Sequence, residues 1–231
     1  MKSLQMEWVK LGAVAGLVGG LSYFGTQIPV IPIQIARLLA FSFGPWLIIW
    51  AVGIYVFLSL SQKSISAQIG AIFIGIAGFT VNIMLVIQQS IFSILEGYGE
   101  LIKEVSDPAA KDSLRMSWHG IHAVHYGLDV SFDIFLMVGL TLLSIAMLSH
   151  PRFGKILAIR GILLNLAALF INLSTFPIPP GSEDYTYMDL GPFIGLWCLV
   201  VAIQMMRSLK WTKNKIEEAR VKDKMVMINS Q

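Results

Sequence analysis

The sequence predicts an all-α integral membrane protein, a six-helix bundle with both termini in the cytoplasm. The first reason is composition: 55% of the 231 residues are hydrophobic and only 13% are charged, about half the charged share of an ordinary soluble domain. The second is the mean hydropathy of +0.70. The third is a set of six mostly apolar stretches, each long enough to supply the roughly 20 residues that a helix needs to cross a bilayer. These observations exclude a disordered chain and a water-soluble globule.

The expected spans follow one another without a long polar segment, so we expect one transmembrane domain over residues 1–208. They cover residues 8–26, 37–60, 66–95, 127–149, 156–176 and 189–208. Lipid offers the backbone no hydrogen-bond partner, and the spans do not alternate polar with apolar residues. Helices are therefore the expected spanning structure.

The first span, residues 8–26, follows a lysine-bearing N-terminus and could be mistaken for a secretory signal. The stretch after it, residues 27–35, lacks a small-x-small cleavage pattern and carries two prolines, so we expect a retained membrane helix. Gly12, Gly16 and Gly20 recur at four-residue intervals. This spacing predicts close packing against a neighbouring helix, either within the chain or, as the alternative, in a homo-oligomer.

Basic residues determine the expected orientation. If both termini are cytoplasmic, only four of the 17 lysines and arginines lie outside, namely Arg37, Lys103, Lys111 and Arg115. This distribution follows the positive-inside rule. The surplus positive charge lies in a tail at residues 209–231, which we expect to contact anionic lipid headgroups. Because the charge is confined to this tail, nucleic-acid binding is not expected.

The most informative segment is residues 115–133, which holds three of the four histidines. At about 100° per residue, one arc of about 80° collects its polar and aromatic residues Arg115, Trp118, His122, His125, Asp129 and Asp133. The apolar run that follows is short, so we expect the hydrocarbon layer to begin near Asp129. An ionised carboxylate facing lipid costs at least about 2.5 kcal/mol. Asp129 and Asp133 are therefore expected to face the bundle interior.

The third span has a matching polar face, formed by Asn82, Gln89, Ser93, Glu96 and Glu100. We expect an outward-facing polar cavity lined chiefly by the third and fourth spans. Further candidates near its outer end are Thr26, Gln27, Gln34, Arg37, Asn172, Thr175, Tyr185, Tyr187 and Asp189. The residues expected to bind a cation or a small polar ligand there are Asp129, Asp133, Glu96, Gln89 and Arg37. In the alternative, such groups only pair with one another, for instance Arg37 with Asp129, and hold the helices in register.

Three kinds of chemistry could use this cavity. His122 and His125 share a helix face and could bind a divalent metal such as zinc, with Glu96 or Gln89 completing the shell. The histidines and aspartates could instead form a ladder of titratable groups for proton-coupled transport. A metal-activated water could hydrolyse a lipid or peptide, but no H-E-x-x-H motif is present.

We favour a binding or transport role over catalysis, because no residue stands out as a general base. A membrane-embedded metal-dependent hydrolase and a non-catalytic accessory subunit of a membrane complex remain as alternatives. Two residues outside this segment have structural interpretations. His150 is expected to be a turn residue between the fourth and fifth spans. Cys198, the single cysteine, is interpreted as a small core residue and excludes an intrachain disulfide.

Three motifs in the second half carry a resemblance to a known family. They are HPRFGK at residues 150–155, NLSTFPIPP at residues 172–180 and DLGPFIGLW at residues 189–197. With them, the chain resembles a bacterial family of small membrane proteins with about six helices, known only as a domain of unknown function. The resemblance implies a multi-pass protein of the cytoplasmic membrane and supplies no catalytic residues.

Overall fold

The computed structural model describes residues 2–26, 28, 30–94, 98–180 and 186–229. Every regular element in these ranges is an α-helix, so the predicted all-α class is confirmed. The helices are α1 (Lys2–Gly25), α2 (Ile33–Ser59), α3 (Ile65–Ile94), α4 (Tyr98–Glu104), α5 (Pro108–Met147), α6 (Lys155–Thr175), α7 (Gly191–Arg207) and α8 (Leu209–Asn229).

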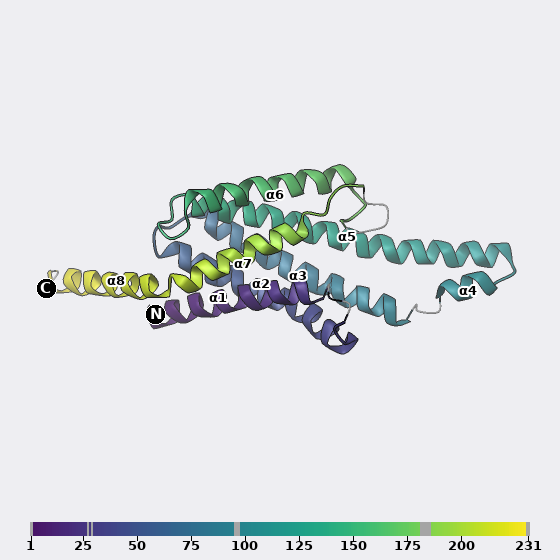
Figure 1. Cartoon of the computed structure of the whole chain (residues 1–231), viewed down its shortest axis with the longest axis horizontal. Helices are drawn as coiled ribbons and strands as arrows, with labels where there is room; N and C mark the ends of the chain where they lie inside the picture. Colours follow the sequence, from purple (N-terminus) through teal and green to yellow (C-terminus); the bar gives the residue numbers. More distant parts are fainter. Residues whose placement is uncertain (1, 27, 29, 95–97, 181–185, 230–231) are drawn as a thin grey trace.

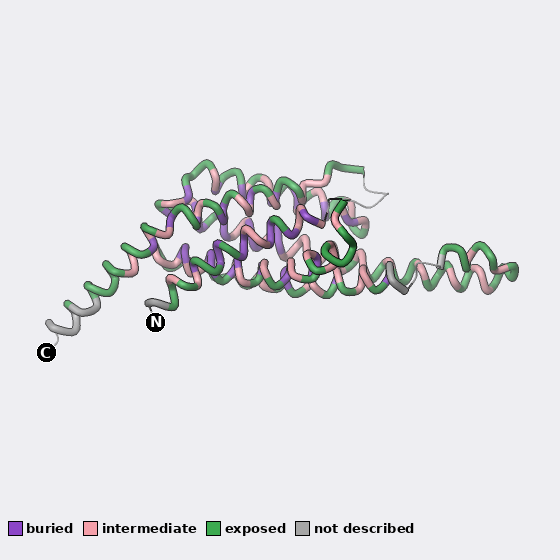
Figure 2. The backbone as a smooth tube through the Cα atoms, turned by 60° about the horizontal axis from the view of Figure 1, so that its bottom comes forward, coloured by how far each residue is buried: buried purple, intermediate pink, exposed green. Residues whose placement is uncertain are grey.

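The long helices pack side by side along one axis (Figure 1). Neighbours follow the order α7, α1, α2, α3, α5 and α6, and α6 returns to touch α7 only briefly. Buried residues concentrate between the helices, whereas the projecting part of α5 alternates between exposed and intermediate residues (Figure 2). The core is apolar: Trp50, Ile54 and Phe57 of α2 are at most 1% exposed, and Leu140 and Leu143 of α5 are fully buried.

Four helices are long and apolar enough to cross a membrane, namely α2, α3, α5 and α6. The bent pair of α7 and α8, with an angle of 55° between them, raises the number to five if it forms one span. The chain therefore has the helices of a multi-pass membrane protein. Within the described residues, α1 is not among these candidates, because Lys10 and several glycines dilute its apolar stretch.

Helix α5 has 40 residues, which corresponds to about 60 Å and twice the roughly 30 Å of hydrocarbon in a bilayer. Its start is fixed by Asp107, whose side chain accepts a hydrogen bond from the Ala109 amide at 3.2 Å, and by Pro108 in the first turn. The N-terminal part of α5 projects from the bundle together with α4 (Figure 1). The polar segment at residues 115–133 thus runs along one uninterrupted helix into the bundle.

The glycines of α1 pack within the chain. A Cβ atom on Gly12 would overlap the Cα atom of Gly53 in α2, one on Gly16 would overlap the indole of Trp50, and one on Gly20 would overlap Leu199 of α7. The three glycines are buried between α1 and these two neighbours. The within-chain alternative is therefore the arrangement found, and a second copy could reach this ridge only if the bundle opened.

Candidate cation-binding cavity

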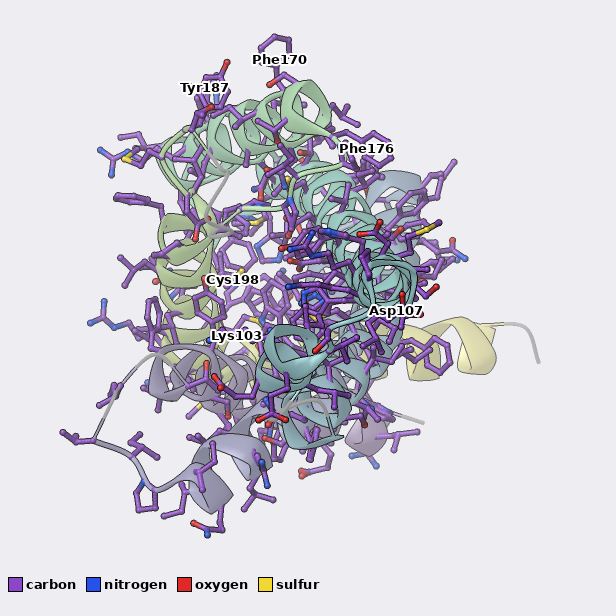
Figure 3. The ribbon with its side chains drawn as sticks, turned by 90° about the vertical axis from the view of Figure 1, so that its right-hand side faces the viewer. Lys103, Asp107, Phe170, Phe176, Tyr187 and Cys198 are labelled. Atoms are coloured by element: carbon purple, nitrogen blue, oxygen red, sulfur yellow. The ribbon has the colours of Figure 1, made fainter. Side chains whose placement is uncertain are left out.

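A cavity of about 170 Å³ lies inside the bundle, enclosed by α1, α2, α5, α6 and α7. It occupies the half of the bundle that bears the α6–α7 connection, which we call the outer half. Its polar lining residues include Asp129 and Asp133 of α5, Asn172 of α6, and Asp189 just before α7. Figure 3 looks along the bundle from this end, with Cys198, another lining residue, among the helices.

Asp133 is held by a neighbouring helix. Its Oδ2 atom accepts a hydrogen bond of 2.6 Å from the side-chain amide of Asn172, which is 2% exposed. Asp129 lies one helical turn away on the same face of α5 and also lines the cavity. Both side chains therefore face the bundle interior rather than lipid.

Asp189 supplies a third carboxylate from the start of α7. Its Oδ1 atom accepts a hydrogen bond of 2.7 Å from the amide of Gly191, which satisfies one of the free donors at a helix N-terminus. A Cβ atom on Gly191 would lie 2.9 Å from the Tyr23 hydroxyl and 3.0 Å from Asp189 Oδ1. The absence of a side chain at Gly191 therefore lets these two oxygen-bearing groups converge.

The charges around the cavity have one sign. Among the described residues that line it, none is lysine, arginine or histidine. Buried charges are strongly disfavoured unless they are paired, and electrostatic attraction is stronger where water is scarce. Three carboxylates in this setting favour a cation, or protons on the carboxylates themselves.

Aromatic rings form part of the wall. The ring centroids of Tyr23 and Phe43 lie 5.9 Å apart, and those of Phe43 and Phe132 lie 6.3 Å apart. This row of rings joins α1, α2 and α5 beside the carboxylates. Trp50 lines the cavity deeper in the bundle, where its indole lies against Gly16.

Two residues expected in the site lie elsewhere. Arg37 of α2 donates a hydrogen bond from Nε to Gln89 Oε1 of α3 at 3.1 Å, and neither residue lines the cavity. Glu96, which was also expected to bind the ligand, lies outside the described residues, as do Gln27 and Tyr185.

The expectation that the third span lines the cavity is wrong, since no described residue of α3 does so. Helix α3 packs instead on a face of α5 where Gly70 and Gly139 let the two backbones approach. A Cβ atom on either glycine would lie 2.9 Å from the carbonyl oxygen of the other. This close contact leaves no room between α3 and α5 at that level.

The two expected metal ligands lie on the projecting side of the cavity. His122 has its Nδ1 atom 3.0 Å from the carbonyl oxygen of Trp118, and its ring lies 4.3 Å from that of Trp118. His125 lies 5.8 Å, ring to ring, from Tyr126. In the described part of the chain, no three His, Cys, Asp or Glu side chains are placed to hold a metal ion. The zinc interpretation thus gains no support from these residues.

Comparison with known proteins identifies no relative. No family model matches the chain, and neither does any curated protein or solved structure. The resemblance described above therefore stays an expectation, and the function has to be argued from the cavity.

Tyr23, Phe43 and Trp50 were not expected to line the site, because aromatic residues in membrane proteins are usually interfacial anchors. One signal could have identified Tyr23. It lies seven residues after Gly16, which places it on the same face of α1 as the glycine ridge. A ridge that faces the bundle interior brings Tyr23 inside as well.

Proposed function

We propose that the chain is a protein of a bacterial cytoplasmic membrane that crosses it six times and binds a cation in the cavity from the outer side. In this proposal, α1 and α7 also span the membrane, with α1 packed between α2 and α7. Two observations support the topology. The N- and C-termini lie at the same end of the bundle (Figure 1). Most lysines and arginines lie in segments at that end, and the positive-inside rule assigns such an end to the cytoplasm.

The observation that carries the proposal is the position of Asp129 and Asp133. They line a cavity inside an apolar bundle, together with Asp189 and without a basic side chain among the described lining residues. A protein that buries carboxylates in this way needs a bound cation or bound protons to offset their charge. Exchange of bound protons for a bound cation would then be the activity of the site.

Proton-coupled transport is one use of such a site. His122, His125, Asp129 and Asp133 lie on the continuous helix α5, over about 17 Å along its axis. Entry of a cation would displace protons from the aspartates, and the histidines nearer the projecting end of α5 would accept them. Intramembrane titratable residues of this kind are typical of proton pathways.

The test uses the purified full-length protein in detergent at neutral pH. Thermal unfolding is followed with sodium, potassium and methylammonium chloride at constant chloride concentration. We expect at least one cation to stabilise the wild type, and the stabilisation to be lost in Asp129→Asn and Asp133→Asn. Asp112→Asn, an exposed change on the projecting part of α5, is the matched control and keeps it. Equal shifts in all variants would contradict the proposal.

A further inference from the structure

We propose that the projecting part of α5, residues 108–127, pairs with the same segment of a second copy, so that the protein forms a parallel dimer. We call this segment the arm. The inference goes beyond the cation site, and it rests on the proposed function only in taking α5 to cross the membrane. Three features of the arm support it: its position beyond the lipid, an exposed apolar face, and the placement of its charges.

The arm lies outside the hydrocarbon layer. Helix α5 has 40 residues, or about 60 Å, and the layer takes up only about 30 Å. The uncharged residues 134–147 form the end of α5 inside the bundle, so the excess length is at the N-terminal end, where the arm projects with α4 (Figure 1). Apolar side chains on the arm are therefore exposed to water, where the hydrophobic effect favours their burial.

One face of the arm is exposed and largely apolar. Six exposed residues fall within an arc of about 100° and define what we call the arm face: Ser113, Met116, Ser117, Gly120, Val124 and Gly127. Met116 is 75% exposed and Val124 is 58% exposed. A Cβ atom on Gly120 or Gly127 would meet no neighbouring atom within 4 Å in the described part of the chain. Exposed apolar surface of this kind marks an interaction site.

The partly buried residues of the arm lie on its other side. Leu114, Trp118 and His122 recur there every four residues, and the rings of Trp118 and His122 lie 4.3 Å apart. Helices α3 and α4 both contact α5. The arm face lies roughly 150° around the helix from these residues. Among the described residues, contacts within the chain therefore leave the arm face open.

The charges of the arm indicate that its partner is a second copy. Lys111, Asp112 and Arg115 all lie outside the arc of the arm face. Because copies inserted in the same membrane point their arms the same way, a pair formed through this face brings each residue against its own counterpart. Like charges at such positions would repel each other, and the arm face carries none. A partner with a basic or acidic surface would find no opposite charge there.

The spacing of the arm face suits such a pair. Residues 113, 117, 120, 124 and 127 are separated alternately by four and three positions, which is the period of a two-helix coiled coil. The serine hydroxyls are already bonded within the helix. Ser113 Oγ donates to the carbonyl oxygen of Ala109, and Ser117 Oγ donates to that of Ser113, both at 3.0 Å. A neighbouring helix can therefore cover them without leaving a donor unpaired.

Disulfide cross-linking of the full-length protein in isolated membranes tests which face meets the second copy. Ser117→Cys and Val124→Cys place a thiol on the arm face, whereas Asp112→Cys and His119→Cys place one about 140° away around the helix. With copper phenanthroline, we expect the arm-face variants to give about fivefold more cross-linked dimer, because a disulfide needs Cα atoms within about 7 Å of each other. The wild type is the control without an added thiol, since its single cysteine, Cys198, lines the cavity inside the bundle.

A change of charge tests whether residue 124 meets its own counterpart. Val124→Lys places like charges opposite each other and is expected to weaken the dimer at least about tenfold. Sedimentation of the purified protein in detergent over a range of concentrations measures this change. His119→Lys is the matched control, and it keeps the wild-type dimer. Val124→Asp is expected to be weakened alone and to form a mixed dimer with Val124→Lys, which shows that the variants are folded.

Any of four results would overturn the pairing: a monomeric wild type, cross-linking of Asp112→Cys as strong as that of Val124→Cys, Val124→Lys and Val124→Asp proteins that stay apart when mixed, or a cross-link to a different protein in place of the second copy. The cation site would stand in each case, because Ser117 and Val124 do not line the cavity. If instead Asp129→Asn and Asp133→Asn kept the cation stabilisation of the wild type, the proposed cation site would fail and the arm pairing would stand.

Discussion

Buried titratable residues have different surroundings at the two ends of the bundle. At the inner end, which bears the α5–α6 connection, His150 is 5% exposed, and its ring centroid lies 4.8 Å from Phe57, 5.3 Å from Phe153 and 5.2 Å from Trp211. In the outer half, the carboxylates border open space. The comparison teaches that burial alone does not indicate function. A titratable group can exchange partners only where the packing leaves room for one.

Backbone and side-chain contacts reinforce the closure of the inner end. Gln204 of α7 donates a hydrogen bond of 2.6 Å to the carbonyl oxygen of Arg152, and the Arg152 Nε atom lies 3.3 Å from Ser208 Oγ. These bonds tie the α5–α6 connection to the end of α7. The inner end is therefore closed by polar contacts as well as by aromatic packing.

Phenylalanine truncation on α2 gives the largest expected contrast. Phe57→Ala removes a fully buried ring from the aromatic cluster and should lower the free energy of unfolding by about 3–5 kcal/mol. Phe43→Ala, on the same helix at the cavity wall, should cost roughly half as much, because its ring is partly exposed and already borders a void. Unfolding by dodecyl sulfate in mixed micelles measures both. Equal losses would remove the distinction between the sealed and open ends.

The pH dependence of stability sharpens the comparison at His150. Burial, aided by the nearby charge of Arg152, lowers the pKa of this histidine to about 4, against an ordinary value of about 6.5 in the unfolded chain. Both states are neutral above that value. As the pH falls from about 6.5 to 4, the unfolded chain takes up a proton that the folded chain refuses, so stability decreases over this window.

The measurement is the free energy of unfolding between pH 7.5 and 4 for the wild type and His150→Asn. We expect a steeper loss of stability on acidification in the wild type, since the variant cannot take up that proton. Parallel curves would show that the histidine ring is open to water, which would contradict the sealed inner end.

A smaller effect is expected at the start of α7. Asp189→Ala removes the acceptor for the Gly191 amide and should lower the free energy of unfolding by about 1 kcal/mol, the usual net contribution of one hydrogen bond. It should also weaken cation stabilisation, because one of three carboxylates is lost. Asp189→Asn keeps the hydrogen bond and separates the two effects: stability recovers while cation binding stays weakened. If Asp189→Asn bound the cation as well as the wild type does, the Asp189 carboxylate would not contribute to the site.

The smallest effect is expected on the exposed helix α8. Lys215 and Glu218 form an ion pair of 2.7 Å, with 40% and 63% of their side chains exposed. Glu218→Gln should change the free energy of unfolding by less than about 0.5 kcal/mol. It should leave cation stabilisation intact, in contrast to the cavity carboxylates. A loss comparable to that of Asp133→Asn would mean that the aspartate effects reflect general charge and not a site.

The sequence predicts the parts of this account that depend on composition and on one helix at a time. Apolar length predicts the helices, and the 3.6-residue period places Asp129 and Asp133 on one face that lipid disfavours. Which neighbour meets that face depends on packing between helices. The polar face of α3 suggested one answer, but no described residue of α3 lines the cavity, and α1, α2, α6 and α7 surround the aspartates instead.

The aromatic wall and the role of His150 could not be predicted for the same reason. A histidine before a proline is typical of a turn, and only the packed cluster of Phe57, Phe153 and Trp211 shows that its ring is buried. Trp50 likewise needs its position over Gly16 before its N–H is seen to lack a partner.

The central claim is that cations reach the carboxylates in the outer half of the bundle. The single cysteine, Cys198, lines this cavity and reports on it directly. The most direct measurement is its rate of modification in the folded protein by a cationic aminoethyl thiosulfonate and by the anionic sulfonatoethyl reagent, each relative to a free thiol. We predict that the cationic reagent reacts about tenfold faster, as expected for an acidic cleft that concentrates cations, and that the ratio approaches one in Asp129→Asn/Asp133→Asn. Equal rates in the wild type, or a thiol that neither reagent reaches until the protein unfolds, would contradict the account.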